Sequence, residues 1–527
     1  MMKVMVFDGI SNDGLEVLKN AGVDYSVLPK MTEDEIIAIV SEYEGILVRS
    51  ATKITRKIME AASNLKIVGR AGVGVDNIDV KAATEKGIIV VNSPGGNTTA
   101  AAELTVALIM NVARMVPQAH GKLVKGEWDK KSFTGVELRH KVLGVIGLGK
   151  IGAHVAKVMR GMEMRVIAYD PFVSQEMAKN MGVEIKSFDE VIKESDFITV
   201  HLPLTAETRN LIGAKQFAKM KKGVRVVNVA RGGIINEGEL CAALQSGQVA
   251  GAALDVFEKE PMTECPLFNL PGVVVTPHLG ASTKEAQIGV AIDVAEEIVR
   301  VAKGELVHNA VNLPSIKPEV YALLGPYIPL VKRMGKFLGQ IISGNLEEVE
   351  IRYNGALAAF DLETLTNTFL NGLLKPILEE GVNFINAPVV AKERGIKVKE
   401  TKTEVMEDFT NLITVYITTD NETRSVSGTL LKNDDMRFVR VDDYTVDVVP
   451  HGHMLFIPHM DKPKIIGKVG TMIGEHEINI ASMIVGRKIL GGKAVMVLQI
   501  DNFVPKDTLD DIKKIDGVLD VKYVYID

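Results

Sequence analysis

Short apolar runs alternate with amphipathic stretches through the first part of the chain. Each run is a few residues long, and the stretch that follows it carries apolar residues at helical spacing. This alternation predicts repeated βα units, and therefore parallel sheets with helices on both faces. The strands that it predicts in the first hundred residues lie at 4–7, 25–28, 46–48, 67–69 and 88–91.

A second series of strands follows a helical stretch at residues 99–110, which is expected to lead from a first unit into a second. After this series, Ser282 and Glu285 have the spacing of a helix capping box, and the helix that they start is predicted to end near residue 302. This helix is expected to return the chain to the first unit, which then consists of residues 1–98 and 283–312. The second unit, residues 99–282, has predicted strands at 141–146, 165–169, 197–200, 224–229, 250–254 and 273–275.

The pattern changes after residue 313. Helical stretches up to residue 386 and alternating apolar segments near 349–353, 412–417 and 438–441 predict an α+β unit at 313–450, without a catalytic motif. The last unit, residues 451–527, shows strand, helix, strand, strand, helix and strand patterns in that order. These predict a βαββαβ fold with elements at 453–456, 465–473, 479–485, 493–500, 506–514 and 518–524.

The composition is that of an ordinary globular chain of several domains. It has 527 residues, of which 46% are apolar and 24% charged, and a net charge of −6. That charge gives no general attraction to nucleic acid or to an anionic membrane, and no apolar run is as long as a membrane span. Two cysteines, Cys241 and Cys265, are too few for a disulfide framework, and the first residues lack the apolar core of a signal peptide. We therefore expect a cytoplasmic protein without nucleic-acid or membrane partners.

Three glycines give the most specific chemical signal in the chain. Gly147, Gly149 and Gly152 directly follow an apolar run and open a helical pattern, and the next apolar run ends in Asp170. Strand, G-x-G-x-x-G turn, helix, strand and acidic residue form the dinucleotide-binding unit of a Rossmann-type domain. The helix N-terminus would face a pyrophosphate, and Asp170 would accept both ribose hydroxyls and repel a 2′-phosphate. The sequence thus predicts NAD rather than NADP as the cofactor.

Chemically useful side chains follow the later strands of the same unit. Arg231, Asp255, Glu260 and His278 each come after a predicted strand, so that they should meet at one edge of a parallel sheet. His278 could take a hydroxyl proton, Glu260 could orient its ring, and Arg231 could clamp a substrate carboxylate. Taken singly, each could be an ordinary loop residue; together on a nucleotide-binding fold they favour hydride transfer to or from a 2-hydroxy acid.

Polar residues also follow three strands of the first unit. Arg49-Ser50, Arg70 and the loop from Asn92 to Asn97 stand at the ends of the third, fourth and fifth predicted strands. Two arginines and an amide-rich loop at one edge favour an anionic ligand, although solvated arginines would give the same pattern. Trp128, the single tryptophan, stands among charged residues, as a half-covered surface ring or as an anchor at a subunit interface.

From residue 1 to about 310 the chain resembles the D-isomer-specific 2-hydroxyacid dehydrogenase family. The resemblance rests on the glycine motif with Asp170, on residues 228–232 and 255–261, and on Pro277-His278-Leu279-Gly280. It implies a Rossmann-type domain inserted in a flavodoxin-like substrate domain, catalytic roles for Arg231, Glu260 and His278, and a contact of Asp255 with the nicotinamide region. The cofactor-binding residues that it implies are Gly147, Gly149, Lys150, Ile151, Gly152, Asp170, Val229, Ala230, Arg231, Asp255, His278, Gly280 and Ala281.

Within this family the substrate-side motifs are most similar to those of members that oxidise 3-phospho-D-glycerate with NAD in serine synthesis. This similarity implies that Arg49 and Arg70 help to hold carboxylate and phosphate. In relatives, a basic residue beside the matching tryptophan reaches the active site of a neighbouring subunit, which implies a homo-oligomer, expected to be a tetramer, without a bound metal. The substrate-binding residues implied are Arg49, Ser50, Arg70, Gly72, Asn97 and Lys130.

The C-terminal βαββαβ unit resembles an ACT domain, a ligand-sensing module of amino-acid biosynthesis, and residues 313–450 take the place of an intervening domain. In serine-inhibited relatives, residues matching His459, Asp461 and Asn479 bind L-serine. Asp461 replaces an amide of that pattern and Lys464 replaces a glycine, so an ACT fold used only for assembly is the alternative.

Two other functions compete with the oxidation of phosphoglycerate. A related dehydrogenase could act on glyoxylate, hydroxypyruvate or D-lactate, and Arg49 and Lys130 would then have no phosphate to bind. A non-enzymatic NAD-sensing scaffold could use the same fold, but it would not need Arg231, Glu260 and His278 together.

Overall fold

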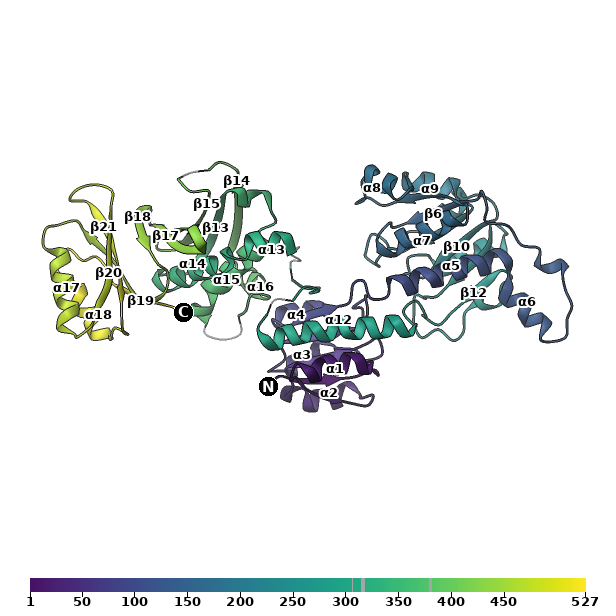
Figure 1. The fold of residues 1–527 in the computed structure, drawn as a ribbon, viewed down its shortest axis with the longest axis horizontal. Helices are drawn as coiled ribbons and strands as arrows, with labels where there is room; N and C mark the ends of the chain where they lie inside the picture. Colours follow the sequence, from purple (N-terminus) through teal and green to yellow (C-terminus); the bar gives the residue numbers. More distant parts are fainter. Residues whose placement is uncertain (306, 314–317, 379–381, 407) are drawn as a thin grey trace.

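The structure is a computed structural model that describes residues 1–305, 307–313, 318–378, 382–406 and 408–527. The described residues form four β-sheets, and each of the four ranges predicted as domains encloses one of them. Figure 1 shows an elongated molecule, with the second unit at one end, the C-terminal unit at the other and the first unit between them. The domain limits themselves stay predictions.

The first unit is a five-stranded parallel sheet in the order β2-β1-β3-β4-β5. Strand β3 is buried along its whole length, as parallel strands with helices on both faces are. Its elements are β1 (Lys3–Val6), α1 (Asn12–Asn20), β2 (Asp24–Val27), α2 (Glu33–Ile39), η1 (Val40–Glu42), β3 (Gly45–Val48), α3 (Arg56–Ala61), β4 (Ile67–Arg70), α4 (Val80–Glu85) and β5 (Ile89–Asn92).

Helix α12 (Lys284–Lys303) returns the chain from the second unit to this sheet, where Val294 and Ile298 pack in the same core as Leu47. The prediction for its N-terminus was wrong by one residue. Thr283, not Ser282, is the N-cap, and its hydroxyl accepts the N–H of Ala286. Both residues can cap a helix, and the pattern by itself does not decide between neighbours.

The second unit is a seven-stranded parallel sheet in the order β12-β11-β10-β9-β6-β7-β8. Its strands are β6 (Val142–Ile146), β7 (Arg165–Tyr169), β8 (Glu184–Ile185), β9 (Phe197–Val200), β10 (Val224–Asn228), β11 (Val249–Leu254) and β12 (Val273–Val275). Its helices are α5 (Thr98–Arg114), α7 (Lys150–Gly161), α8 (Gln175–Asn180), α9 (Phe188–Glu194), α10 (Ala214–Lys219) and α11 (Glu237–Gln245), with η2 (Lys131–Phe133) and η3 (Pro266–Asn269).

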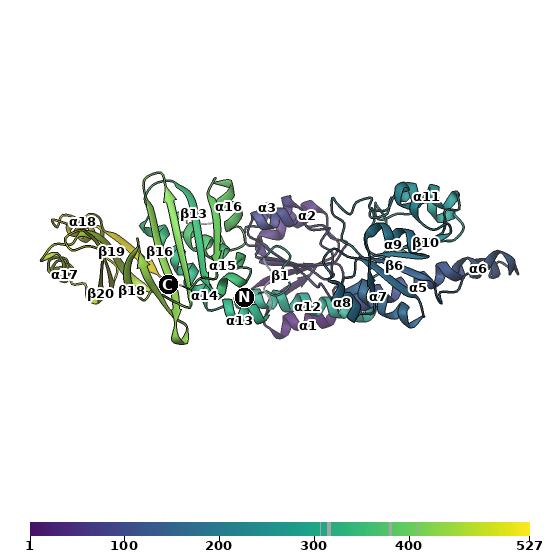
Figure 2. The same cartoon turned by 90° about the horizontal axis from the view of Figure 1, so that it is seen from above.

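An arm leaves the second unit where α5 ends. Helix α6 (Val116–Leu123) starts at Met115, whose φ of 51° turns the chain, and it projects from the end of the molecule (Figure 2). Among the described residues no single helix is long and apolar enough to cross a membrane. The pair α5 and α6, bent by 62°, meets that test only by its combined length and composition.

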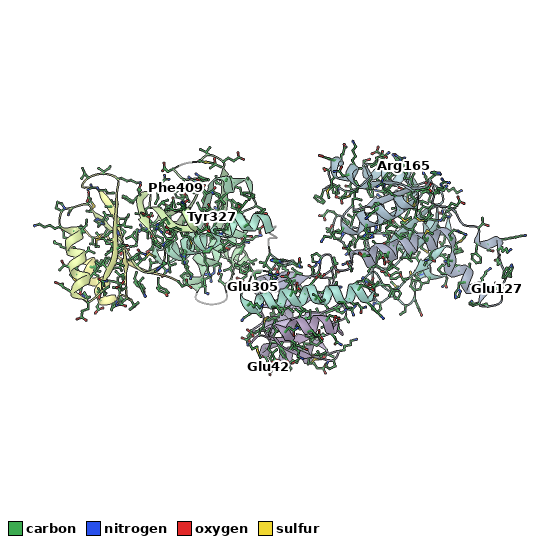
Figure 3. All side chains as sticks on the ribbon, in the orientation of Figure 1. Glu42, Glu127, Arg165, Glu305, Tyr327 and Phe409 are labelled. Atoms are coloured by element: carbon green, nitrogen blue, oxygen red, sulfur yellow. The ribbon has the colours of Figure 1, made fainter. Side chains whose placement is uncertain are left out.

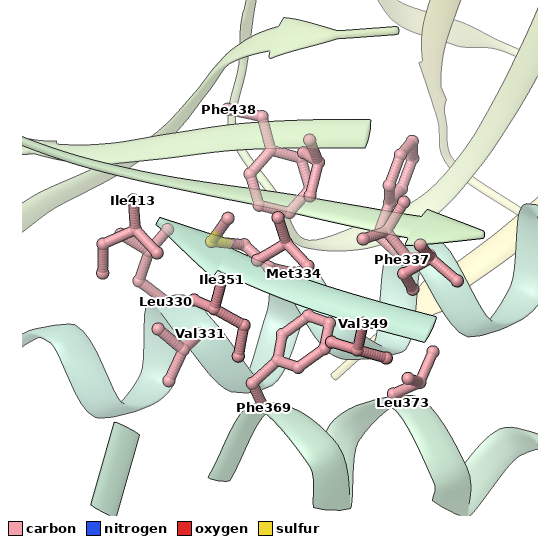
Figure 4. Packing of buried hydrophobic residues seen from close by; sticks show 14 of the residues in the cluster. Leu330, Val331, Met334, Phe337, Val349, Ile351, Phe369, Leu373, Ile413 and Phe438 are labelled. Carbon is pink, nitrogen blue, oxygen red and sulfur yellow. The ribbon is translucent and has the colours of Figure 1, made fainter. Parts of the chain in front are cut away.

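The third unit packs helices on one six-stranded sheet, in the order β14-β13-β15-β16-β17-β18. Phe337, Phe369 and Phe438 fill the layer between helices and sheet (Figure 4). Its strands are β13 (Leu346–Gly355), β14 (Lys397–Thr403), β15 (Asn411–Thr419), β16 (Thr423–Leu431), β17 (Asp435–Val441) and β18 (Tyr444–Val448). Its helices are α13 (Pro318–Leu324), α14 (Tyr327–Ile341), α15 (Glu363–Leu378) and α16 (Ala387–Glu393), with η4 (Ala356–Ala359) and η5 (Lys432–Asp434).

Within the helical stretches predicted up to residue 386, the apolar pattern over residues 318–342 runs without a break, but it forms two helices. Helix α13 ends at Leu324, and Pro326 is the N-cap of α14. Proline has no N–H to donate and disfavours helical backbone in the residue before it, so Gly325 and Pro326 break the apolar pattern that runs through them.

The fourth unit has the predicted βαββαβ order, and its four strands are arranged β20-β21-β19-β22. Its elements are β19 (Gly452–Met460), α17 (Ile465–Glu475), β20 (Ile480–Arg487), β21 (Lys493–Ile500), α18 (Lys506–Lys513) and β22 (Lys522–Ile526). Helices α17 and α18 cover one face of this sheet. On the other face, Phe456 packs against Phe337 of α14, so one hydrophobic core joins the third and fourth units.

Candidate active site

The glycine turn has the geometry that nucleotide binding needs. Gly147 has a φ of 95°, and a Cβ on Gly152 would come within 2.0 Å of the carbonyl oxygen of Gly147, so helix α7 lies close to the turn. A Cβ on Gly149 would meet nothing within 4 Å, which leaves open space where the pyrophosphate would approach. The loop therefore fits a dinucleotide at the N-terminus of α7.

Asp170 holds the same turn from the end of β7. One of its carboxylate oxygens accepts the N–H of Leu148 at 2.8 Å and the other accepts the N–H of Phe172 at 2.8 Å. Each oxygen keeps a second lone pair for a further donor. Contact with the ribose hydroxyls stays a prediction, and the structure adds a local role in shaping the loop.

His278 and Glu260 form a hydrogen-bonded pair. The Nδ1 atom of His278 lies 2.7 Å from Oε2 of Glu260, and the other carboxylate oxygen accepts the N–H of Phe257 at 3.0 Å. Partial burial by itself raises the pKa of Glu260, but the hydrogen bonds from His278 and Phe257 and the nearby charges of His278 and Arg231 outweigh it, so the pKa lies below its usual value. Glu260 is thus an ionised partner that fixes one nitrogen of the imidazole.

A buried carboxylate positions the loop that carries His278. Asp255 is 0% exposed, and it accepts hydrogen bonds from the hydroxyl of Thr276 and from the N–H groups of Leu279 and Gly280. Its backbone carbonyl accepts the N–H of His278, whose φ is 56°. Burial raises the pKa of Asp255, against the lowering effect of these donors.

This burial gives Asp255 a role that was not predicted. The covered carboxylate has three protein donors and holds the loop that carries His278. Contact of Asp255 with the nicotinamide region stays a prediction. The sequence places Asp255 and Thr276 at the ends of two predicted strands. The hydrogen bond between them becomes visible only in the tertiary structure.

Arg231 lies beside this pair because two loops approach closely. A Cβ on Gly232 would come within 1.9 Å of the carbonyl oxygen of Phe257, so the loop after β10 packs directly on the loop that leads to Glu260. Asn228 is buried and supports the turn: its amide donates to the carbonyl of Arg231 and its side-chain oxygen accepts the N–H of Ala230. Val229, which precedes them, is also buried.

On the facing unit, Arg70 lies close enough to Arg231 and to Arg49 to be affected by their charges. Burial, followed by repulsion from Arg231, lowers the pKa of Arg70 to about 10, with smaller effects of attraction by Asp76 and repulsion by Arg49. The Nε atom of Arg70 is buried without a hydrogen-bond partner among the described residues. Gly72 makes room for this guanidinium, since a Cβ there would lie 2.1 Å from Nη1 of Arg70. The arrangement gives a positive surface for an anionic ligand.

Other predicted contacts border the same region. The side-chain oxygen of Asn97 is buried and has no partner among the described residues. Lys150 reaches from the glycine turn toward the first unit, where its Nζ would lie 3.3 Å from a Cβ on Gly95. Ser50 is exposed at the end of β3, and Ile151, Ala230 and Ala281 are half-buried, whereas Gly280 is buried against Asp255.

Two residues at this site carried no predicted role. Asp76 is an ion-pair partner of Arg231. His201 follows β9, where burial lowers its pKa to about 4 and its Nε2 lies 3.0 Å from the hydroxyl of Thr199. Its carbonyl oxygen would be 2.6 Å from a Cβ on Gly147, so the backbone of His201 supports the glycine turn. The sequence signal for both was their place after a strand or a glycine-rich loop.

Lys130 lies apart from the other predicted site residues. It is exposed in the segment after α6, with its Nζ 5.8 Å from the centre of the Trp128 ring. Figure 3 labels Glu127 in this segment, at the end of the molecule farthest from the C-terminal units. Within one chain, Lys130 does not join the arginine cluster.

The three predicted effector residues do not form one site within the chain. His459 is buried, with its ring near the carbonyl of Ile457, and Asp461 pairs with Arg487. Asn479 donates to Asp501 at the opposite end of the sheet, because the antiparallel register places Ile480 beside Ile500, which pairs with His453. The described residues also contain no group of three or more His, Cys, Asp or Glu side chains placed to hold a metal ion.

Family models match three parts of the chain. Residues 106–280 match the NAD binding domain of D-isomer specific 2-hydroxyacid dehydrogenases. Residues 323–442 match the D-3-phosphoglycerate dehydrogenase intervening domain, and residues 453–517 match the ACT domain.

Similarity to named proteins extends over the whole length. A D-3-phosphoglycerate dehydrogenase from Archaeoglobus fulgidus is 46% identical over 526 residues, which are 99% of this chain and 100% of that protein. One from Synechocystis is 47% identical over 522 residues, 99% of this chain and 94% of that protein. The chain belongs to the D-3-phosphoglycerate dehydrogenase family. Membership confirms the predicted NAD-binding, intervening and ACT domains, NAD as the cofactor and the dehydrogenase class.

Solved structures of other dehydrogenases match the first two units. D-lactate dehydrogenase from Escherichia coli aligns with a TM-score of 0.53 and 27% identity, covering 59% of this chain and 100% of that one. A glyoxylate reductase from Paecilomyes thermophila aligns with a TM-score of 0.54 and 31% identity, covering 59% of this chain and 98% of that one. The catalytic half of the D-3-phosphoglycerate dehydrogenase family thus shares its fold with dehydrogenases of other 2-hydroxy acids.

Proposed function

We propose that this protein oxidises 3-phospho-D-glycerate to 3-phosphohydroxypyruvate with NAD, as the first step of the phosphorylated route to L-serine. The observation that carries the proposal is the pair of His278 and Glu260 beside Arg231, on the edge that faces Arg70 and Arg49. The relatives named D-3-phosphoglycerate dehydrogenase support the choice of substrate.

In this reaction His278 is the base. Its Nδ1 is bound to Glu260, so Nε2 is the nitrogen that accepts the proton of the hydroxyl on carbon 2. The ionised Glu260 keeps the ring oriented and stabilises the imidazolium that forms. Arg231 binds the substrate carboxylate and polarises the developing carbonyl oxygen. NAD, when bound, accepts the hydride that leaves carbon 2.

The remaining predicted residues select the ligands. Arg49, Ser50, Arg70 and Asn97 supply charge and hydrogen bonds to the carboxylate and phosphate from the first unit. Asp170 disfavours the 2′-phosphate of NADP through repulsion between negative charges. A substrate without a phosphate would lose the contacts that Arg49 and Lys130 provide.

The test is an assay of NADH absorbance with 3-phosphoglycerate, D-lactate, glyoxylate and hydroxypyruvate, each with NAD(H) and NADP(H). We expect turnover with 3-phosphoglycerate and NAD to exceed every other combination. If the protein turns over D-lactate or glyoxylate but not 3-phosphoglycerate, it belongs to another substrate class. If it binds NAD but turns over none of these substrates, the non-enzymatic NAD-sensing scaffold is favoured.

We also propose that the active form is a homo-oligomer, expected to be a tetramer, in which the arm after α5 contacts a second copy. Val116, Leu123, Val124 and Trp128 are all exposed on this arm, and several large exposed apolar side chains on one short segment favour an interface. Lys130, at the same place, would then reach the phosphate of a neighbouring active site.

Mixed oligomers test this arrangement. Chains with Lys130→Ala and chains with His278→Ala are combined, dissociated and reassembled. In mixed pairs one site receives an intact His278 and an intact Lys130, so we expect the mixture to recover activity toward about a quarter of the unmodified level, as half of the pairs are mixed and half of their sites intact. A mixture no more active than its two components would contradict the shared site.

We further propose an amino-acid effector, with L-serine as the first candidate, for the ACT unit, and a cytoplasmic location. The location is supported by Cys241 and Cys265, which are both unpaired. Titration with L-serine and cell fractionation followed by an antibody to this chain test the two proposals.

A further inference from the structure

Arg231, the proposed clamp for the substrate carboxylate, already has an anionic partner. Its Nε lies 3.2 Å from a carboxylate oxygen of Asp76. Asp76 belongs to the loop between β4 and α4 of the first unit, whereas Arg231 follows β10 of the second. The ion pair therefore bridges the two units whose facing edges form the site.

The loop of Asp76 is shaped for this contact. A Cβ on Gly74 would lie 2.0 Å from Nη2 of Arg231 and 2.7 Å from the carboxylate of Asp76. A side chain at this position would have to displace the ends of both charged side chains, so Gly74 leaves the space that the ion pair occupies.

The charges around Asp76 are those that a bound carboxylate would meet. Asp76 attracts Arg70 as well as Arg231, and Arg70 is repelled by both Arg231 and Arg49. The Asp76 side chain is 71% exposed, whereas that of Arg231 is 28% exposed. The carboxylate can therefore move into solvent, while the guanidinium stays at the cleft.

We propose that Asp76 is an internal counter-ion that holds Arg231 in the substrate-free protein and yields its place to the substrate carboxylate. Asp76 is then a positioning residue, because it acts through Arg231 and touches no reacting atom. The inference rests on the proposed function, since it takes Arg231 as the carboxylate clamp. Every carboxylate ligand has to displace the same partner, so Asp76 weakens all of them by a common factor.

The first test measures equilibrium binding of 3-phosphoglycerate and of D-glycerate to the NADH-bound protein by calorimetry. In Asp76→Asn we expect the dissociation constants of both ligands to fall by about two- to fivefold, the range for a largely exposed ion pair. Asp76→Glu, which keeps the charge, should restore the original constants. Asp24→Asn removes an equal charge from the same unit at an exposed position in β2 and should leave both constants unchanged.

A double-variant cycle tests whether the effect passes through Arg231. When Arg231→Gln is already present, Asp76→Asn should no longer change the affinity for either ligand. Unchanged or weaker binding in Asp76→Asn alone would overturn the proposal, as would an equal gain in the Arg231→Gln background, which would mark a general charge effect.

A merely structural role of Asp76 predicts a different split of the kinetic constants. If Asp76 only oriented Arg231 for catalysis, Asp76→Asn would lower kcat without lowering KM, whereas the counter-ion predicts a fall in KM. Failure of the unmodified protein to oxidise 3-phosphoglycerate would remove the proposed substrate but not this inference, because D-glycerate binding still reports on displacement. If the unmodified protein oxidises 3-phosphoglycerate but Asp76→Asn does not bind the ligands more tightly, the counter-ion inference is wrong and the proposed function stands.

Discussion

Arg231, Glu260 and His278 follow three neighbouring strands, β10, β11 and β12, whereas His459 and Asn479 stand at opposite ends of the ACT sheet. The members of each set come from separate stretches of the sequence. The first set meets, with 2.7 Å between His278 and Glu260, and the second does not.

Strand direction explains the difference. All strands of the second unit are parallel, so their carboxyl ends lie at the same edge of the sheet. The residues that follow these strands are therefore brought together. In the ACT sheet β19 and β20 both run antiparallel to β21, so they share one direction. His459 lies near the carboxyl end of β19, whereas Asn479 precedes β20 at its amino end, and the two residues therefore stand at opposite ends of the sheet. A site that uses His459, Asp461 and Asn479 together therefore requires two chains.

The largest effect is expected for the base. His278→Ala removes the proposed proton acceptor, and general acid–base catalysis contributes roughly 10²- to 10⁴-fold, so kcat should fall at least about a hundredfold. The side chain is 46% exposed, so thermal unfolding should change little. If kcat, measured by NADH formation, fell only a few-fold, His278 would not be the base, although it lies at one edge with Arg231 and Glu260.

Glu260→Gln should lower kcat about 10- to 100-fold, since a hydrogen bond to a charged group is worth roughly 1.5–3 kcal/mol. The pH dependence of stability sharpens this prediction. Because the pKa of Glu260 is below its usual value of 4.5, its ionised form stabilises the folded chain above about pH 4.5, and this stabilisation is lost as the pH falls through the lowered pKa. The unfolding free energies of the unmodified protein and the variant should therefore differ by a constant amount from pH 5 to 8 and converge at lower pH in urea titrations. A difference that grows on acidification would contradict this sign.

A smaller effect on activity is expected for the residue that holds the loop. Asp255→Asn replaces one buried acceptor by an amide that cannot accept the N–H groups of both Leu279 and Gly280, so unfolding free energy should fall by about 1–3 kcal/mol. The kcat should fall about tenfold as His278 loses its support. Thr276→Val removes one donor to the same carboxylate at constant volume and should cost less in both measurements. Equal losses in the two variants would show that Asp255 acts in another way.

The smallest effect concerns the ACT unit. If serine binds across two chains, His459→Ala and Asn479→Ala should each lose the serine-induced rise in melting temperature, and reassembled mixtures of the two should regain part of it. A rise that is lost in one variant only, or that the mixture fails to regain, would show that these residues do not share a site. In that case His459 and Asn479 would form no common site, either within one chain or between two chains.

Local features of the nucleotide site were predictable from sequence because they depend on neighbours along the chain. The glycine spacing fixes the turn, as the positive φ of Gly147 and the close approach at Gly152 show. The order of the strands was not predicted from the sequence, but the strand ends that carry Arg231, Glu260 and His278 needed only a parallel direction to meet. Their catalytic roles stay predictions.

Contacts between loops could not be read in the same way. Asp255 was predicted only as a cofactor contact, and the folded structure adds its hydrogen bonds with Thr276, Leu279 and Gly280, which hold the His278 loop. Asp76 is one acidic residue among many until the two units face each other. Pro326 divides an apolar helical pattern into two helices. The periodicity of apolar residues alone would predict one continuous helix, because it takes no account of the N–H that proline lacks.

The amino-acid sequence by itself determined the four units, the dinucleotide turn and the residue types at the strand ends, because hydrophobic period, glycine freedom and chain direction are local properties. Only the tertiary structure decided which charges pair across the cleft, which carboxylate is buried, and that α14 covers the open face of the ACT sheet. Those outcomes depend on distance and solvent exclusion between segments far apart in sequence, and neither quantity is written in any one stretch of the chain.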